Sequence, residues 1–179
     1  MCIGDGDQDV ALKLLRPVTP DQQAQMAARL KREGAALARL SHPRIVGLLD
    51  QGEHDGTAFL VTELVSGRTL AARLADGPLP EDEVAVLAGR LTDAIAYAHD
   101  QGVIHRDLKP GNVMLQGDDL KVLDFGLARI TGSDVEAATL TRTNLAMGTL
   151  NYLAPEQRED ARRVDHRADV FSLGVILYE

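Results

Sequence analysis

Near the middle of this 179-residue chain, residues 105–112 read His-Arg-Asp-Leu-Lys-Pro-Gly-Asn. Within this octapeptide, the carboxylate of Asp107 can accept a hydrogen bond from a hydroxyl group, and Lys109 can neutralise charge on a moving phosphoryl group. Asn112 offers a neutral oxygen ligand to Mg²⁺. Phosphoryl transfer depends mainly on positioning and charge stabilisation, and these three side chains supply both. The alternative interpretation is a turn that is merely rich in polar residues.

A second motif, Asp124-Phe125-Gly126, begins twelve residues after Asn112 and follows the apolar pair Val122-Leu123. The apolar pair suggests a strand, so Asp124 is expected at a strand end, where a carboxylate can bind Mg²⁺ that bridges phosphates. Alone, the tripeptide would indicate only a turn. Its position behind the octapeptide favours the metal-binding interpretation.

One lysine stands inside the short apolar run of residues 10–15, which reads as a buried strand. Lys13 can be a surface residue whose stem lies along apolar neighbours, or an ammonium held in a cleft to grip phosphates. The second interpretation needs a carboxylate partner, and Glu33 on the next predicted helix is the candidate. Taken alone, Glu33 would read as a solvated helix residue.

The order of the predicted elements divides the chain into two parts. Strands are expected at residues 10–15, 45–49 and 58–64, and helices at residues 21–40, 69–75, 81–99 and 165–179. Strands therefore come first and helices dominate later, which indicates a small sheet-rich lobe and a helical lobe. A cleft between two such lobes is a common ligand site.

A glycine interrupts the first predicted helix. Gly34 lies inside the helical pattern of residues 21–40, where glycine weakens a helix by roughly 1 kcal/mol relative to alanine. On sequence grounds, Gly34→Ala is therefore expected to raise stability.

Taken together, these motifs resemble the eukaryotic-type protein kinase superfamily and are most similar to its bacterial Ser/Thr branch. The resemblance covers nearly the whole chain, with the motifs in the family's order and spacing. It includes Val-Ala-Leu-Lys at 10–13, Ser-His-Pro at 41–43, Ala-Pro-Glu at 154–156 and Asp-Val-Phe-Ser-Leu-Gly at 169–174. The resemblance implies an α+β, bilobal protein-kinase-like fold. Residues 1–65 then form a partial N-lobe of strands plus a regulatory helix, and residues 66–179 form a partial, mostly helical C-lobe with the catalytic and activation loops.

The resemblance implies a protein serine/threonine kinase, which transfers the γ-phosphoryl group of ATP to Ser or Thr hydroxyls of proteins. Mg²⁺, or Mn²⁺ in its place, is the implied metal. Asp107 is then the catalytic base, Asn112 and Asp124 bind the metal, and Lys13 forms an ion pair with Glu33. The Leu-Lys-Pro sequence after the base is similar to the Ser/Thr branch rather than the Tyr branch. The Ala-Pro-Glu motif favours a protein substrate over a small molecule.

The resemblance also implies which residues meet the nucleotide. Ala11 and Met114 sandwich the adenine ring, and the segment from Glu63 to Val65 is the hinge whose backbone meets adenine. Thr62 stands beside the deep pocket, and its small side chain leaves that pocket open.

In the same family, a hydrophobic column and one acidic side chain align the active state. Leu37, His105 and Phe125 are the expected members of the column. Asp169, on the last predicted helix, is expected to hold the backbone of the catalytic loop.

The long segment of residues 126–151 has little periodicity, and loops of this length are usually functional or disordered. Thr141 and Thr143 resemble the autophosphorylated Thr-x-Thr of bacterial kinases, and a phosphate there could pair with Arg106. Thr149 matches the floor on which a substrate peptide docks. We expect autophosphorylation in trans, which requires self-association. The alternative is that threonine is simply frequent in exposed loops.

The composition argues against several classes of partner. A net charge of −8 and a pI near 5.1 argue against a protein that binds nucleic acid or an anionic membrane. The single cysteine, Cys2, allows no disulfide within the chain and agrees with a reducing, cytoplasmic compartment. The last long apolar stretch, residues 170–178, is shorter than the roughly 20 residues that a membrane span requires.

Two features of the family are not found in the sequence. Only twelve residues precede Lys13, too few for the Gly-x-Gly-x-x-Gly-x-Val loop, and Gly4-Asp5-Gly6 is read as a turn before the strand. The last predicted helix reaches Glu179 without a cap. A fold truncated at both ends is therefore expected. The alternative to an active kinase is a catalytically incomplete fragment that acts at most as a nucleotide- or partner-binding module.

Overall fold

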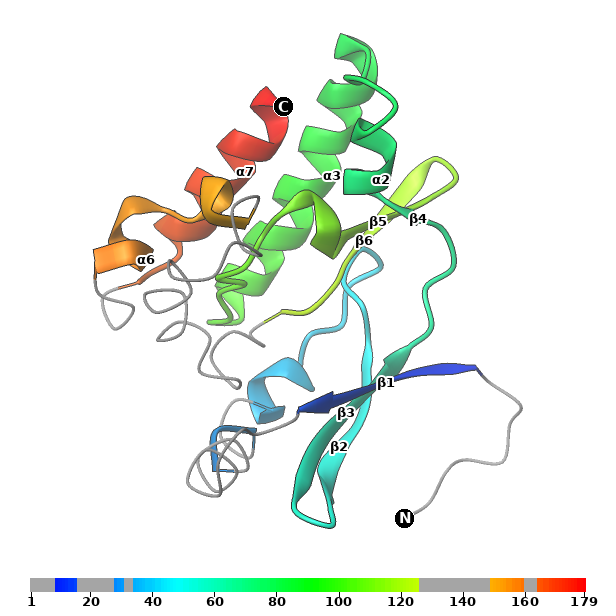
Figure 1. Ribbon diagram of the computed structural model, residues 1–179, viewed down its shortest axis with the longest axis vertical. Helices are drawn as coiled ribbons and strands as arrows, with labels where there is room; N and C mark the ends of the chain where they lie inside the picture. Colours follow the sequence, from blue (N-terminus) through cyan, green and yellow to red (C-terminus); the bar gives the residue numbers. More distant parts are fainter. Residues whose placement is uncertain (1–8, 16–27, 31–33, 126–148, 160–163) are drawn as a thin grey trace.

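The computed structural model describes residues 9–15, 28–30, 34–125, 149–159 and 164–179. Figure 1 shows two parts, a three-stranded sheet in the lower half and a group of helices with a second small sheet in the upper half. The mixed, two-lobed architecture predicted from the sequence is therefore confirmed.

The first sheet consists of β1 (Val10–Leu15), β2 (Leu48–His54) and β3 (Thr57–Glu63) in the antiparallel order β1-β3-β2. Successive side chains of a strand point to opposite faces, so Ala11 and Lys13 share one face of β1. Both residues line the cleft between the lobes.

The hairpin that joins β2 and β3 differs from the prediction. The sequence predicts a turn over residues 50–57, but strand pairing continues to His54 and the turn contains only Asp55 and Gly56. Both turn residues have positive φ, 47° and 74°, as a two-residue hairpin turn of type I′ requires. The polar composition concealed the strand, because much of β2 is exposed and needs no apolar alternation.

The helical lobe is organised around α3 (Glu81–Asp100), which nearly coincides with the predicted helix 81–99. Three acidic residues in its first turn favour the positive end of the helix. Its buried side chains recur every three or four residues: Leu87, Leu91, Ala94, Ile95 and Ala98. They belong to the main core, which also contains residues of the second sheet.

The second sheet pairs β4 (Arg68–Thr69) with β5 (Val113–Gln116), and β5 with β6 (Asp119–Val122). The short helix α2 (Leu70–Leu74) follows β4 directly. Thr69 caps α2, because its Oγ1 accepts a hydrogen bond from the Ala72 amide at 3.1 Å. The prediction of a helix near residues 69–75 is therefore correct, with Thr69 as its cap.

The last helix, α7 (Arg167–Tyr178), is buried on one face only. The sequence of residues 165–179 is apolar on most sides of the predicted helix, which favours a central position. Within the described part of the chain, the buried positions are Ala168, Asp169, Ser172 and Ile176, whereas Val170, Phe171 and Tyr178 are exposed. No helix in this part is both long and apolar enough to cross a lipid bilayer.

The two lobes are joined through the segment that precedes β2. Ile45 forms a parallel bridge with Val122 at the end of β6, and Val122 exchanges backbone hydrogen bonds of 2.8 and 3.0 Å with Arg44 and Val46. The Arg44 guanidinium also contacts Asp93 of α3 at 2.8 Å and Asp119 of β6 at 2.9 Å. This segment therefore belongs to the sheet-rich lobe in sequence but is fastened to the helical lobe.

Gly34 lies against the side chain of Gln51, a contact that the sequence did not reveal. It is buried in the helical stretch of residues 34–37, facing β2. A Cβ atom at this position would stand 1.8 Å from Gln51 Oε1, far inside contact distance. Gln51 Oε1 is itself buried without a hydrogen-bond partner among the described residues. The three atoms nearest to that Cβ all belong to the free end of the flexible Gln51 side chain, which can turn aside, so the expected stabilisation by Gly34→Ala stays a prediction.

We predict that Gly34→Ala raises the free energy of unfolding by less than about 1 kcal/mol, because displacement of the Gln51 side chain offsets part of the gain in helix propensity. In a Gln51→Ala background, the same substitution should give the full gain of about 1 kcal/mol. Urea unfolding of the four proteins measures this coupling. An equal gain in both backgrounds would contradict the contact between Gly34 and Gln51.

Candidate active site

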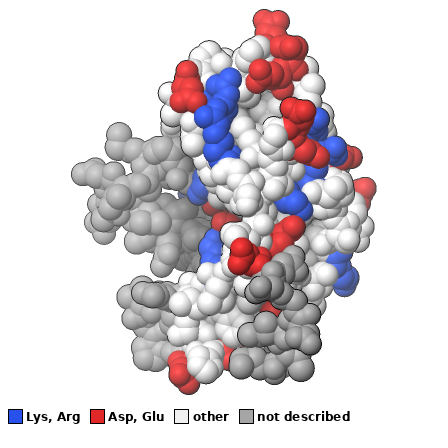
Figure 2. Space-filling view, turned by 90° about the vertical axis from the view of Figure 1, so that its right-hand side faces the viewer, with Lys and Arg blue, Asp and Glu red and all other residues white. Residues whose placement is uncertain are grey.

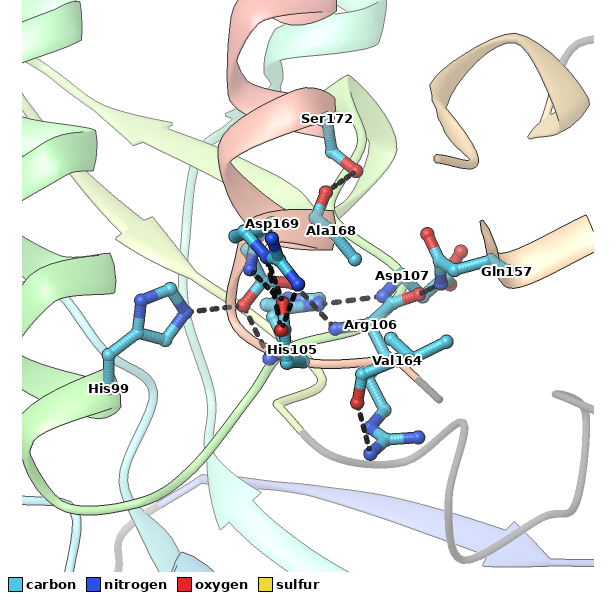
Figure 3. Close-up of polar contacts among 11 residues, drawn as sticks. His99, His105, Arg106, Asp107, Gln157, Val164, Ala168, Asp169 and Ser172 are labelled. Atoms are coloured by element: carbon cyan, nitrogen blue, oxygen red, sulfur yellow. Dashed lines mark hydrogen bonds and ion pairs between the residues drawn. The ribbon is translucent and has the colours of Figure 1, made fainter. Parts of the chain in front are cut away.

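The backbone of the octapeptide is held by one buried carboxylate of α7 (Figure 3). Asp169 Oδ2 accepts a hydrogen bond from the His105 amide at 2.8 Å, and Oδ1 accepts one from the Arg106 amide at 2.8 Å. His99 Nε2, near the end of α3, lies 2.7 Å from Asp169 Oδ2. The expected role of Asp169 as an anchor of this backbone is therefore confirmed.

Asp169 stays ionised although its side chain is fully buried. Burial alone would raise the pKa of its carboxyl group. The hydrogen bond with His99, the charge interaction with His105 and the two backbone amides outweigh burial, so the pKa lies below its usual value. A charged acceptor makes stronger hydrogen bonds than a neutral one, which makes this anchor a firm one.

Arg106 adopts a left-handed backbone conformation with φ of 69°. For a residue with a side chain, this conformation costs roughly 1–2 kcal/mol, so surrounding contacts have to maintain it. Its amide is held by Asp169, its carbonyl accepts a hydrogen bond from Gln157 Nε2 at 2.7 Å, and its Nη2 donates to the Val164 carbonyl at 3.2 Å.

The three polar residues predicted to act together do lie together after this strained position. Lys109 Nζ is 2.8 Å from Asp107 Oδ2. Asn112, in the 3-10 helix η1 (Pro110–Asn112), donates through Nδ2 to the Asp107 carbonyl at 2.8 Å and to Oδ2 at 3.1 Å. Both side-chain contacts of Asp107 with described residues fall on Oδ2, which leaves Oδ1 to accept a further hydrogen bond. Because Asn112 uses its nitrogen, its Oδ1 is left as a ligand atom.

Asp124 follows a residue that the octapeptide fixes from two sides. The Leu123 amide donates to the Asn112 carbonyl at 2.8 Å, and the Leu123 carbonyl lies 2.8 Å from His105 Nε2. Asp124 itself has a positive φ of 62°. The two predicted metal ligands, Asn112 and Asp124, therefore belong to one hydrogen-bonded unit.

Lys13 reaches from β1 to Asp124, where its Nζ lies 2.5 Å from Oδ2. Both side chains are partly exposed, so the pair contributes little to stability, and its position matters more than its energy. The expected partner of Lys13, Glu33, lies outside the described residues, and the Lys13–Glu33 ion pair stays a prediction. The structure does bring Lys13 and Asp124 to the same edge of the cleft.

A cleft of about 360 Å³ lies between the lobes and has mostly apolar walls. Its volume is in the range typical of small-molecule sites. The residues predicted to meet the adenine ring line it, namely Ala11, Glu63, Val65 and Met114, and so does Thr62, which was predicted to stand beside the deep pocket. Asn112 is not among its lining residues. Lys13 and Asp124 line it as well, so its apolar interior meets charged groups at one edge.

The side chain of Glu63 is engaged in a contact between the lobes. Its Oε1 lies 2.6 Å from Lys121 Nζ of β6 and accepts a hydrogen bond from the Gly47 amide at 2.8 Å. Burial alone would raise the pKa of Glu63, but these two partners outweigh it and the pKa is lowered. Lys121 was not identified from the sequence, because a lysine in a short strand reads as a solvent-facing residue.

Part of the predicted hydrophobic column is in place. The rings of His105 and Phe125 lie 4.6 Å apart between centroids, and both residues are buried. Leu37 is buried as well and lines the cleft together with Phe125. Aromatic contact at this distance contributes to the alignment of the octapeptide with the segment that begins at Asp124.

Two other predicted residues, Thr141 and Thr143, lie outside the described residues and remain predictions. Thr149 begins the 3-10 helix η3 (Thr149–Tyr152), but its side chain lies outside the described part. The short helix α6 (Pro155–Glu159) follows, with Glu156 half-buried in its first turn.

Two polar residues of the site escaped the sequence analysis. Gln157 of α6 accepts a hydrogen bond from the Ala154 amide at 3.1 Å and donates to the Arg106 carbonyl. Ser172 Oγ donates to the Tyr152 carbonyl at 2.8 Å. For Ser172, the available signals were its place in the 169–174 motif and its three-residue spacing from Asp169, which puts both on one face of α7.

A sheet lobe and a helical lobe that enclose an apolar cleft, with a lysine, carboxylates and an asparagine at its edge, define the bilobal kinase class of fold. The chain belongs to the protein kinase family, because the family described as Protein kinase domain matches residues 1–179. Its relatives place it in the bacterial branch of the eukaryotic-type kinases.

Among curated proteins, the serine/threonine-protein kinase pkn3 of Myxococcus xanthus is 41% identical over 180 residues, which cover 97% of this chain and 32% of pkn3. The serine/threonine-protein kinase PknL of Mycobacterium tuberculosis is 39% identical over 97% of this chain and 42% of PknL. The chain therefore spans less than half of the length of these relatives.

Solved kinase structures share the fold. The PknI kinase domain of Mycobacterium tuberculosis matches with a TM-score of 0.69 and 30% identity, over 94% of this chain and 60% of that chain. Residues 1–466 of Rad53 in complex with AMP-PNP match with a TM-score of 0.70 and 31% identity, over 94% of this chain and 40% of that chain.

We predict that Asp169→Asn lowers the free energy of unfolding at neutral pH by about 3 kcal/mol, because an amide presents a donor to backbone amides that need an acceptor. Asp118→Asn in the exposed β5–β6 turn is the matched control and should be nearly neutral. Since the pKa of Asp169 is lowered on folding, its ionised form stabilises the protein above the unfolded pKa near 3.9. The difference in the free energy of unfolding between the unaltered chain and Asp169→Asn should therefore shrink as the pH falls through the folded pKa of Asp169. A difference that does not change down to about pH 2 would refute this assignment.

Proposed function

We propose that this chain is the core of a protein serine/threonine kinase, which transfers the γ-phosphoryl group of ATP to Ser or Thr hydroxyls of proteins. The observation that supports this most strongly is the arrangement around Asp107. Its carboxylate is fixed through Oδ2 by Lys109 and Asn112, and its other oxygen is left for a substrate hydroxyl.

The donor set suits a divalent metal held mainly by phosphates. Among the described residues, no group of three or more His, Cys, Asp or Glu side chains could enclose an ion. Asn112 and Asp124 offer oxygen ligands from one hydrogen-bonded unit, and Mg²⁺ in phosphate sites typically takes only one or two ligands from the protein. We propose Mg²⁺, with Mn²⁺ as an alternative. When bound, such an ion neutralises charge on the phosphates.

The side chains of the chain then have separate tasks. Asp107 Oδ1 accepts the hydrogen bond of the substrate hydroxyl and orients it toward the phosphoryl group. Lys109, 2.8 Å from that carboxylate, supplies positive charge where the transferred group passes. Lys13 supplies positive charge at the edge of the cleft, where nucleotide phosphates are attracted. The apolar walls of the cleft suit an adenine ring.

The kind of substrate is inferred from the family and from the charge of the protein surface. Ser/Thr specificity rests on the named relatives and on Lys109 after the base. Figure 2 shows basic and acidic side chains mixed over one face of the molecule, unlike the continuous basic surface of a nucleic-acid-binding protein. We propose a protein substrate and a cytoplasmic site of action, where ATP and a reducing environment are available.

We predict that Asp107→Asn reduces transfer of radiolabelled γ-phosphate from Mg-ATP to a generic basic protein by at least about a hundredfold. Lys13→Met should raise the KM for ATP, whereas Asp118→Asn should leave the rate unchanged. Labelling by Asp107→Asn at the rate of the unaltered chain would contradict the assignment. Circular dichroism of each variant shows whether a loss of rate reflects loss of fold.

We also propose that Thr141 and Thr143 are phosphorylated in trans by a second copy of the chain. An inactive Asp107→Asn chain mixed with active chain and Mg-ATP should then gain phosphate on residues 141–143, as measured by mass spectrometry. Thr139 lies in the same segment but outside the Thr-x-Thr pair. Thr139→Ala therefore serves as the control and should not change the amount of phosphate on residues 141–143. Phosphate that appears on the active chain but never on the inactive one would rule out transfer in trans.

A further inference from the structure

Gln157 is a buried polar residue whose amide is used at both ends. Its side chain is only 6% exposed, although α6 lies near the surface. Oε1 accepts the hydrogen bond of the Ala154 amide at 3.1 Å, and Nε2 donates to the Arg106 carbonyl at 2.7 Å. A buried amide with both ends satisfied fixes the two segments that it joins.

The two segments joined by Gln157 have different tasks. Ala154 ends the stretch that begins at Thr149 and is proposed to carry the substrate peptide. The Arg106 carbonyl belongs to the peptide unit that precedes Asp107, the proposed base. Figure 3 shows Gln157 and Asp169 approaching this part of the backbone from different sides. Gln157 therefore connects the substrate floor directly to the backbone of the base.

The floor is fixed at its other end by α7. Ser172 Oγ donates to the Tyr152 carbonyl at 2.8 Å, and Ser172 lies one turn after Asp169 on the same helix. Arg106 is thus held on both sides of its Cα atom: Asp169 binds its amide, and Gln157 binds its carbonyl. Because φ of Arg106 is 69°, loss of either contact would weaken the restraint on this residue and favour relaxation toward a commoner conformation.

We propose that Gln157 is a positioning residue that sets Asp107 relative to the bound protein substrate. The inference rests on the proposed function. Among the described residues, no hydrogen bond joins Gln157 to a residue that lines the cleft, so nucleotide binding should not depend on Gln157. Loss of the contact should instead turn the carboxylate of Asp107 away from the substrate hydroxyl.

The test compares Gln157→Met, which is similar in size but makes neither hydrogen bond, with Gln157→Glu. The glutamate keeps the acceptor for Ala154 but cannot donate to Arg106 when ionised. We expect kcat toward a protein substrate to fall about tenfold in both variants, with the KM for ATP changed less than about twofold. Gln116→Met, at the exposed end of β5, is the matched control and should behave as the unaltered chain. The ¹³C shift of the Arg106 carbonyl reports the lost hydrogen bond independently of activity.

The outcomes separate the inference from the function on which it rests. A tenfold fall in kcat with a moved Arg106 carbonyl shift and an unchanged KM for ATP supports the positioning role. A kcat within twofold of the unaltered chain in both variants overturns it and leaves the kinase assignment intact. A rise in the KM for ATP as large as the fall in kcat assigns Gln157 a general structural role and also overturns the proposal. If the unaltered chain transfers no phosphate, the proposed function falls and the role of Gln157 falls with it.

Discussion

The carboxylate of Asp169 meets three hydrogen-bonding groups from two other parts of the chain, α3 and the octapeptide, and the geometry of the site depends on it. A buried charge is costly unless hydrogen bonds satisfy its oxygens, and here His99 and the amides of His105 and Arg106 do so. The contact fixes the octapeptide relative to α7 rather than to its own neighbours in sequence. It also helps to keep Arg106 at a positive φ, because strain of this kind persists only where the surroundings overdetermine the backbone.

The cleft depends on a second set of contacts, which fasten the sheet-rich lobe to the helical one. Val122 pairs with the segment before β2, and Lys121 beside it reaches Glu63 at the end of β3. Asp124 comes two residues after Val122. β6, the strand that leads to the predicted metal ligand Asp124, is therefore also the strand that contacts the sheet-rich lobe. Nucleotide contacts from both lobes can line one cavity because this joint fixes their separation.

Local chemistry in the sequence predicted which residues would come together at the site. The spacing of Asp107, Lys109, Asn112 and Asp124 predicted one phosphoryl-transfer site, and the structure places Asp107 with Lys109 and Asn112, and links Asn112 to Asp124 through Leu123. The helices α2 and α3 were also predicted almost to the residue, because capping and a 3.6-residue period are local signals. The roles of Glu33, Thr141 and Thr143 remain predictions from the resemblance.

Only the tertiary structure decided which ordinary residues support that site. Gln157 and Lys121 look like solvated side chains in the sequence, since their partners lie 51 and 58 residues away and no periodicity connects them. The contact between Gly34 and Gln51 is likewise not visible in the sequence. The last helix was expected to be central because its sequence is apolar on most sides, whereas α7 is buried on one face. Propensity and pattern act over a few residues, whereas close approach and hydrogen bonding across the fold depend on where distant segments come to lie.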